Sequence, residues 1–360
     1  MSLTTRQFGP NPKNEKISIL EMDNNLLYLQ SLGFPTNKLN NSTTNPTILS
    51  YRITATGSFI DNTTIIVYNG INGFNLTNLI SLDLSALSSV GGDNQIYSNT
   101  SMTSLDLSAL SSVGGSNYIY SNTSMSSLDL STLSSVGGDN QIYSNTSMTS
   151  LDLSALTSVG STNNIIDNTS MTSLDLSALT SVGSTNKIID NTSMTTLDLS
   201  ALSSVGGDNY IYSNPTMSSL DLSLLSSVGG TNRISDSALT AIDLSTLDTV
   251  GNNLEIHDNS LLISIDLSSL TSVGSEIKIY NNPLLTDILV NPSGFASTNY
   301  NLTSNALSET SVDNFLVALV ASGATATAVD LTGGSNSTPG TTGSSAIATL
   351  IGLGWTFSTN

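Results

Sequence analysis

The chain has 360 residues, of which 38% are hydrophobic and 10% are charged, and its 8 Lys and Arg stand against 27 Asp and Glu. A net charge of -19 without a basic cluster repels phosphate backbones and anionic lipid, so nucleic acid and membrane surfaces are poor candidate partners. Cysteine is absent, which excludes a disulfide framework, a thiolate metal site and a cysteine nucleophile.

Residues 1–47 differ in composition from the rest of the chain. They combine an extended stretch containing prolines with a short amphipathic stretch, for which we expect a helix with Met22, Leu26 and Leu29 on one face. We expect this face to support homo-oligomerisation, as a trimer. The opening residues lack the apolar region of a secretory signal, so we expect neither export by that route nor insertion in a membrane.

From residue 48 to residue 290 the chain is repetitive. The block SLDLSALSSVGGDNQIYSNTSMT at 81–103 recurs almost unchanged, and Leu82 returns every 23 residues as far as Leu220. One 22-residue step then leads to Ile242. A fixed period of this size is typical of stacked supersecondary units. We therefore predict a mainly β solenoid of 23-residue repeats over 48–290, with β-rich capping coils at its start.

Each repeat predicts two short strands and a turn. Polar and apolar residues alternate at 104–108, which indicates a strand with one buried face. The Tyr-Ile-Tyr triplet at 118–120 indicates a second strand, and the Gly114–Gly115 pair between them indicates a turn that uses the backbone freedom of glycine.

Stacking the coils aligns equivalent residues in columns. The Leu, Val, Ile and Met columns form the predicted core. One polar column is interpreted as an asparagine ladder, in which side-chain amides bond to the turn backbone and to one another; it contains Asn99, Asn122, Asn145, Asn168, Asn191, Asn214, Asn259 and Asn282. Several of these match a glycosylation sequon, but a glycan on every coil would not need this spacing.

The first strand of each coil carries an outward aspartate, and stacking would place these carboxylates about 4.8 Å apart. Hydrogen bonds from adjacent Ser and Thr hydroxyls, together with screening by salt, explain how the repulsion is tolerated. The alternative hypothesis is a Ca²⁺ ion that bridges neighbouring carboxylates; the candidates are Asp106, Asp129, Asp152 and Asp175. We expect no other cofactor or metal.

The second strand carries outward tyrosines, which are the candidate binding residues: Tyr97, Tyr118, Tyr120, Tyr143, Tyr210 and Tyr212. The cations Lys187, Arg233 and Lys278 stand in the column before the buried isoleucine, and Ile166 and Ile189 stand in the column after it. Rows of exposed aromatic residues serve for sugar stacking and protein interfaces. The alternative is cross-strand aromatic pairing that only strengthens the sheet.

No catalytic constellation is recognisable, so we expect a protein that is not an enzyme. The single histidine, His257, is expected to be a solvated side chain. A glycosidase would need paired carboxylates with different pKa values, and the aspartate column shows no break in regularity that would separate them.

After residue 290 the pattern becomes helical. Residues 310–313 resemble a capping box, an apolar run follows, and Gly323 ends the expected helix. A strand at 327–331, a helix at 344–351 and a strand at 355–358 complete a small α+β cap over 291–360, with Trp355 in its core.

The later repeats, such as SIDLSSLTSVGSEIKIYNNPLLTDI at 264–288, resemble the leucine-rich solenoids of the receptor L-domain and BspA-like kind. This resemblance covers 65–290 and implies a right-handed coil with parallel sheets and a role in recognition or scaffolding. The segment EMDNNLLYL at 21–29 resembles N-terminal segments of bacteriophage tail-fibre and related virion proteins, and 305–355 resembles tails that follow such repeats in phage and bacterial surface proteins.

These resemblances imply a non-enzymatic virion structural protein, a fibre or spike component made in the host cytoplasm without a signal peptide. Residues 1–47 would anchor it to other virion proteins, and the solenoid would present a rigid surface to a host surface glycan or protein, or to a neighbouring subunit. A bacterial surface adhesin of the BspA-like kind is the alternative. Ice binding by the Ser/Thr rows is a further alternative, which the charge of the aspartate column disfavours.

Overall fold

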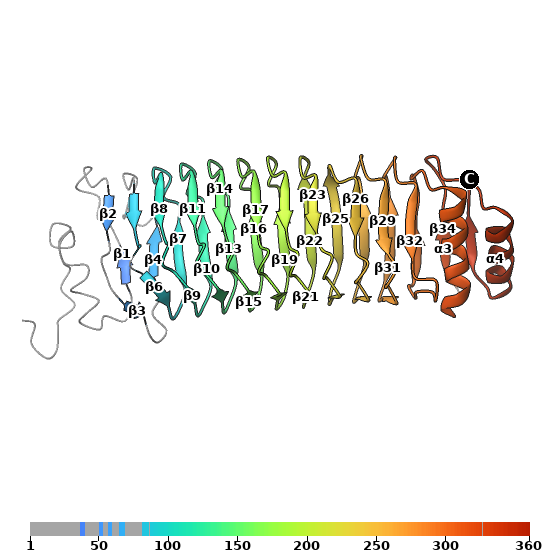
Figure 1. Cartoon of the computed structure of the whole chain (residues 1–360), viewed down its shortest axis with the longest axis horizontal. Coiled ribbons are helices and arrows are strands. Elements are labelled where there is room, and N and C mark those ends of the chain that lie inside the picture. The colour runs from blue at the N-terminus through green and yellow to red at the C-terminus, as the bar shows by residue number, and fades with distance from the viewer. Residues whose placement is uncertain are drawn as a thin grey trace, which may run out of the picture.

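The computed structural model describes residues 81–85, 87–325 and 327–360, together with four short strands before them at 37–39, 50–52, 57–59 and 65–68. In this part of the chain the coils stack into an elongated rod, with helices at its C-terminal end (Figure 1). Neighbouring coils pair in parallel and in register, so that each residue faces its counterpart 23 positions on. The predicted mainly β solenoid is confirmed, whereas Met22, Leu26 and Leu29 lie outside the described residues.

One face of the rod is a 14-stranded sheet, which we call the tyrosine sheet after its outward residues (Figure 1). Its strands, in spatial order, are β1 (Asn37–Leu39), β4 (Ile65–Tyr68), β7 (Asn94–Tyr97), β10 (Asn117–Tyr120), β13 (Asn140–Tyr143), β16 (Asn163–Ile166), β19 (Asn186–Ile189), β22 (Asn209–Asn214), β25 (Asn232–Ser237), β28 (Leu254–His257), β31 (Glu276–Tyr280), β33 (Asn299–Asn301), β34 (Ala328–Asp330) and β35 (Thr356–Ser358).

A second face is the aspartate sheet, which is divided into two parts. The first part has 8 strands: β2 (Ser50–Arg52), β5 (Ser81–Asp83), β8 (Ser104–Asp106), β11 (Ser127–Asp129), β14 (Ser150–Asp152), β17 (Ser173–Asp175), β20 (Thr196–Asp198) and β23 (Ser219–Asp221). The second part has 3 strands: β26 (Ala241–Asp243), β29 (Ser264–Leu267) and β32 (Asp287–Val290).

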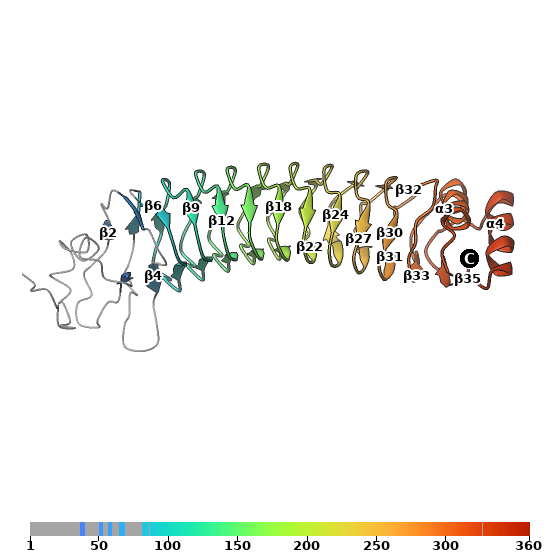
Figure 2. The same ribbon diagram turned by 90° about the horizontal axis from the view of Figure 1, so that it is seen from below.

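A third face, which the sequence did not lead us to expect, is a 10-stranded serine–valine sheet (Figure 2). Most of its strands are only two residues long, too short for a period-two pattern to be visible in the sequence. They are β3 (Gly57–Phe59), β6 (Leu87–Val90), β9 (Ser112–Val113), β12 (Ser135–Val136), β15 (Ser158–Val159), β18 (Ser181–Val182), β21 (Ser204–Val205), β24 (Ser227–Val228), β27 (Thr249–Val250) and β30 (Ser272–Val273).

The core consists of the predicted columns, which lie between the three sheets. Leu107, Ile119 and Met125 are fully buried in one coil, and their counterparts are buried in the coils on either side. No coil encloses a core by itself, so each apolar side chain is buried by the coils above and below it.

The predicted asparagine ladder is confirmed. The backbone N–H of Asn122 donates to Oδ1 of Asn145 at 3.0 Å, and Nδ2 of Asn145 donates to the carbonyl of Ile119 at 2.9 Å. The residue before each ladder asparagine takes a left-handed backbone conformation, as at Ser121 with φ 56°. The buried amides therefore satisfy the backbone of a sharp corner in every coil, which supports the structural interpretation of the sequons.

A second asparagine ladder lies at the start of the tyrosine strands. In it, Nδ2 of each asparagine donates to Oδ1 of the next, as from Asn117 to Asn140 at 2.9 Å. Its members are Asn94, Asn117, Asn140, Asn163, Asn186, Asn209 and Asn232. The sequence carried the signal, since an asparagine stands two residues before the buried isoleucine in each of these coils. In the sequence this column is hard to distinguish, because each asparagine directly follows a polar turn.

The glycine pairs have a different role from the predicted one. Gly114 and Gly137 are not among the glycines with positive φ, so backbone freedom is not what the turn requires. A Cβ at either position would collide with the carbonyl oxygen of the equivalent glycine in the preceding coil. Glycine is needed because successive turns stack backbone on backbone.

The C-terminal cap continues the tyrosine sheet through β33, β34 and β35 and adds α3 (Glu309–Ser322) and α4 (Thr341–Gly352) (Figure 2). Ser308 caps α3 by accepting from the N–H of Ser311, and Gly323 ends it with a left-handed φ. Trp355 is 3% exposed, as predicted for cap core. No helix in the described part of the chain is long and apolar enough to cross a membrane.

The regular stacking is interrupted at the 22-residue step. Ser237 stands where the neighbouring coils have a ladder asparagine, and β26 follows it one residue sooner than β23 follows Asn214. The aspartate sheet divides here, because β23 and β26 are not paired. The tyrosine sheet remains continuous across this irregular coil.

Candidate functional site: the outer face of the tyrosine sheet

The structure brings three of the predicted tyrosines together in one stack. The rings of Tyr97 and Tyr120 lie 4.7 Å apart and those of Tyr120 and Tyr143 lie 4.5 Å apart, with interplanar angles of 7° and 5°. Strand spacing imposes this distance, because the three side chains leave equivalent positions of β7, β10 and β13. Burial, followed by the neighbouring Tyr143, raises the pKa of the Tyr120 hydroxyl.

This stacking changes the chemistry expected of the tyrosines. Both faces of the Tyr120 ring are covered by neighbouring rings, so a sugar cannot stack on it. The outward surface is instead formed by ring edges and phenol hydroxyls. Such a surface recognises hydrogen-bonding groups spaced along the rod rather than the flat face of one sugar.

The remaining predicted tyrosines lie in other arrangements on the same sheet. Tyr118 is half-buried beside the stack, while Tyr210 and Tyr212 meet edge to face at 6.2 Å. Burial, followed by Asp208, raises the pKa of Tyr210. Between the two groups of tyrosines the column contains isoleucines, of which Ile189 is 6% exposed, so it is not the outward residue that was expected.

Arg233 occupies a gap in the tyrosine column. Register places Ser235 between Tyr212 and His257, and its small side chain leaves room for a neighbour. The Arg233 guanidinium fills this room: its Cζ lies 4.4 Å from the centre of the Tyr212 ring, and its Nε donates to Oγ of Ser235 at 3.1 Å. The planar cation thus continues the column of planar rings.

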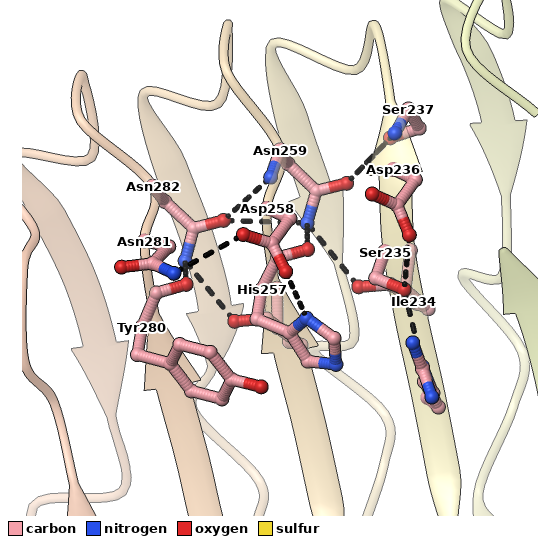
Figure 3. A network of polar contacts seen from close by, with 12 residues as sticks. Ile234, Ser235, Asp236, Ser237, His257, Asp258, Asn259, Tyr280, Asn281 and Asn282 are labelled. Carbon is pink, nitrogen blue, oxygen red and sulfur yellow. Dashed lines mark hydrogen bonds and ion pairs between the residues drawn. The ribbon is translucent and has the colours of Figure 1, made fainter. Parts of the chain in front are cut away.

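His257 is buried, which corrects the expectation of a solvated side chain. It is 5% exposed, and its ring stacks on Tyr280 with 4.6 Å between the ring centres. Its Nδ1 lies 2.7 Å from Oδ2 of Asp258, whose Oδ1 accepts from Nδ2 of Asn281 (Figure 3). The sequence pattern placed His257 in an outward column correctly, but the Tyr280 ring covers one face of the imidazole.

The cation Lys278 is neutralised within the protein. Its Nζ lies 2.9 Å from Glu276 and 3.3 Å from Glu255. The hydrogen bond to Glu276 is the main cause that raises the pKa of Lys278, and the same bond lowers the pKa of Glu276. Lys187 and Arg233, by contrast, have no carboxylate partner among the described residues.

The aspartate column is stabilised by serines. Oδ1 of Asp129 accepts from the backbone N–H of Ser131 at 3.0 Å and from its hydroxyl at 2.7 Å, and these bonds hold the pKa of Asp129 below its usual value. Asp106 and Asp152 repeat both bonds, and Asp175 repeats the backbone bond. In the described part of the chain, no three acidic or histidine side chains are grouped so as to hold a metal ion.

A shallow groove of about 540 Å³ follows the serine–valine sheet. Serine, valine and glycine residues of successive coils line it, together with one threonine. It carries no ionisable side chain, so its chemistry is limited to shape and hydroxyl contacts. The lining residues of its central coils are Ser204, Val205, Gly206, Ser227, Val228 and Gly229.

Comparisons with protein-family models, with curated proteins and with solved structures found no match in any of the three.

Proposed function

We propose that this protein is a non-enzymatic structural protein of a phage particle, a fibre or spike component whose rod presents the tyrosine sheet to a host surface. The outer face of the tyrosine sheet is the observation that supports a role in recognition. Phenol edges and a stacked guanidinium follow one column of a rigid rod. Repeated in-register coils hold these groups at fixed spacing, which reduces the entropy lost on binding a long ligand.

The regular architecture supports a mechanical and displaying role. Three faces of stacked strands enclose a continuous core, and two asparagine ladders bond successive coils, the second of them from Asn94 to Asn232. A rod of this kind holds a surface away from the structure to which it is attached. The resemblance of residues 21–29 to virion proteins supports placing that attachment at the N-terminal segment.

The proposal is tested by immunogold labelling with an antibody raised against the solenoid. Purified particles and uninfected cells from the same culture are labelled in parallel, and pre-immune serum serves as the control. Gold at a defined position on particles is the expected result. Gold on the surface of uninfected cells, with none on particles, contradicts the proposal and supports the adhesin.

The adhesin alternative uses the same surface. The recognition face belongs to the rod and not to the attachment segment, so a cell-surface protein would present it equally well. The two functions differ only in what residues 1–47 attach to. Labelling is therefore a better first experiment than any binding assay.

A further inference from the structure

Lys187 and Arg233 have no carboxylate partner among the described residues, and both stand at the same register position of the tyrosine sheet. Lys187 pairs in register with Tyr210, and Tyr210 pairs with Arg233. Two coil steps separate the two cations, about 10 Å along the rod. In a chain with a net charge of -19, an exposed cation ordinarily finds an acidic neighbour, as Lys278 does with two glutamates.

Arg233 is held in place by uncharged partners. Its Nε–H donates to the Ser235 hydroxyl, and one face of its guanidinium packs on the Tyr212 ring. The Nη groups have no ion-pair partner among the described residues, and they form the fork that binds a carboxylate through two parallel hydrogen bonds. The side chain is therefore ordered before any ligand binds.

The acidic residues near this pair are engaged elsewhere. Asp236 accepts from the Ser235 hydroxyl, and Asp258 contacts His257 and Asn281. Oδ1 of Asp208 accepts from the N–H of Thr231 at 2.7 Å. Asp208 also acts on the Tyr210 hydroxyl, and Glu255, the register partner of Arg233, contacts Lys278. None of these four carboxylates makes an ion pair with Arg233 among the described residues.

We propose that Lys187, Tyr210 and Arg233 form a binding site for an acidic glycan, in which one carboxylate binds the Arg233 fork and a second binds the Lys187 ammonium. An acidic polysaccharide carries carboxylates at regular intervals along an extended chain, as the site requires. Salt screens the net charge of -19 beyond about 10 Å, so the two local cations decide whether such a chain is attracted. Tyr210 lies between the two cations and contacts the intervening sugar. This inference rests on the proposed function, because it names the ligand class of the same recognition face.

The test measures binding of the full chain to soluble polysaccharides by isothermal titration calorimetry in buffer containing EDTA. Polygalacturonate and hyaluronan are the acidic probes, dextran is the neutral probe, and poly-L-glutamate presents carboxylates on a polypeptide. The variants are Arg233→Gln, Arg233→Lys and Lys187→Gln. Gln95→Ala, in the same column near the other end of the rod, is the matched control.

We expect the acidic glycans to bind and dextran to bind far more weakly. Arg233→Gln and Lys187→Gln should each weaken binding roughly tenfold, because each removes one charge-assisted contact. Arg233→Lys should weaken it less, since the charge remains while the fork is lost. Gln95→Ala should leave the affinity unchanged, and added salt should reduce it.

Three results would overturn the inference: no binding to either acidic glycan, equal binding to dextran, or an affinity that the substitutions at Lys187 and Arg233 leave unchanged. Equal binding to poly-L-glutamate would replace the glycan with an acidic protein surface and so overturn the ligand class. Lys187→Gln keeps the test valid if the Arg233 variants fold poorly, because Lys187 makes no ion pair among the described residues. Gold labelling decides the proposed function separately from all of these outcomes.

Discussion

Ser237 donates its hydroxyl to Oδ1 of Asn259 at 2.7 Å, at the position where the neighbouring coils bond asparagine to asparagine. The shorter coil thus joins the ladder through a smaller side chain. The same coil contains Arg233 and Ser235, which place the guanidinium on Tyr212. The irregular coil at the 22-residue step therefore carries the most distinctive chemistry on the outer face of the described solenoid.

Replacing Ser237 by alanine should destabilise the protein. The change removes the donor to Asn259 and the acceptor for the N–H of Leu239, and both of these groups are buried. We expect a loss of about 1–3 kcal/mol in the free energy of unfolding, measured by urea denaturation. Ser245→Ala, a nearby serine whose backbone alone bonds to Asp243, should change it by less than about 0.5 kcal/mol. Equal effects of the two would show that Ser237 does not bridge the ladder.

Replacing Ser121 by glycine should stabilise the protein. Ser121 has φ 56°, a left-handed conformation that glycine adopts without the steric cost paid by a residue with a Cβ. The greater entropy of glycine in the unfolded chain offsets part of this gain, which leaves an increase of about 0.5 kcal/mol. Ser126, which is not among the positive-φ residues, provides the control, and Ser126→Gly should lower stability. A melting temperature that falls in both variants would contradict the argument.

The sequence predicted the repeat, the core columns, the first asparagine ladder and the α+β cap. The first three depend on a pattern repeated many times, such as the leucines returning every 23 residues, whereas the cap depends on an apolar run that Gly323 ends. The serine–valine sheet was missed because a two-residue strand such as β12 has no periodicity of its own. The positions with left-handed φ were missed because Ser, Asp and Asn share that column, and no glycine marks it.

The candidate site was predictable only in part. The tyrosine column was visible in the sequence, but the coverage of the Tyr120 faces depends on the angles of its neighbours. The burial of His257 has the same origin, since a ring next to Tyr280 is covered when the two stack. Arg233 reaches into the neighbouring column, and the signal for this was the single small residue Ser235 among the larger side chains of that column.

Replacing Gly160 by alanine should be strongly destabilising. The new Cβ would collide with the carbonyl oxygen of Gly137 in the preceding coil, and backbone atoms cannot move aside without disturbing both coils. We expect a loss of about 2–3 kcal/mol in the free energy of unfolding. Gly352→Ala in the last turn of α4 is the control, because no atom lies within 4 Å of its new Cβ. Retention of full stability in the Gly160 variant would refute the close-stacking account of the glycines.

Calcium should not stabilise the aspartate column. The Ser131 bonds to Asp129 already occupy one carboxylate oxygen, and the described residues contain no group of three acidic side chains suited to a metal. We expect the melting temperature to be the same in EDTA and in millimolar CaCl₂. Sodium chloride at matched ionic strength controls for screening of the repulsion between neighbouring aspartates. A specific rise with Ca²⁺ that Asp129→Asn abolishes would instead establish the bridging-ion hypothesis.

Tyr300 should make the protein less stable at alkaline pH. It is fully buried among Phe295, Phe315 and Trp355, and burial raises the pKa of its hydroxyl to about 12. The folded-state pKa lies above the ordinary value near 10, so its contribution to stability is complete below pH 10 and is lost as the pH rises towards about 12. The loss amounts to about 2–3 kcal/mol, because each unit of pKa shift corresponds to about 1.4 kcal/mol.

The measurement is urea unfolding at several pH values between neutral and strongly alkaline, on the native chain and on Tyr300→Phe. The variant loses the hydrogen bond of 3.3 Å to the carbonyl of Phe295, so it should be slightly less stable at neutral pH. Its stability should then fall less steeply above pH 10, because phenylalanine cannot ionise. Other tyrosines with raised pKa, such as Tyr120 and Tyr143, remain in both proteins and contribute equally to the two curves. If the free energy of unfolding fell with pH in the same way for both proteins, ionisation of Tyr300 would not be the cause of the alkaline loss of stability.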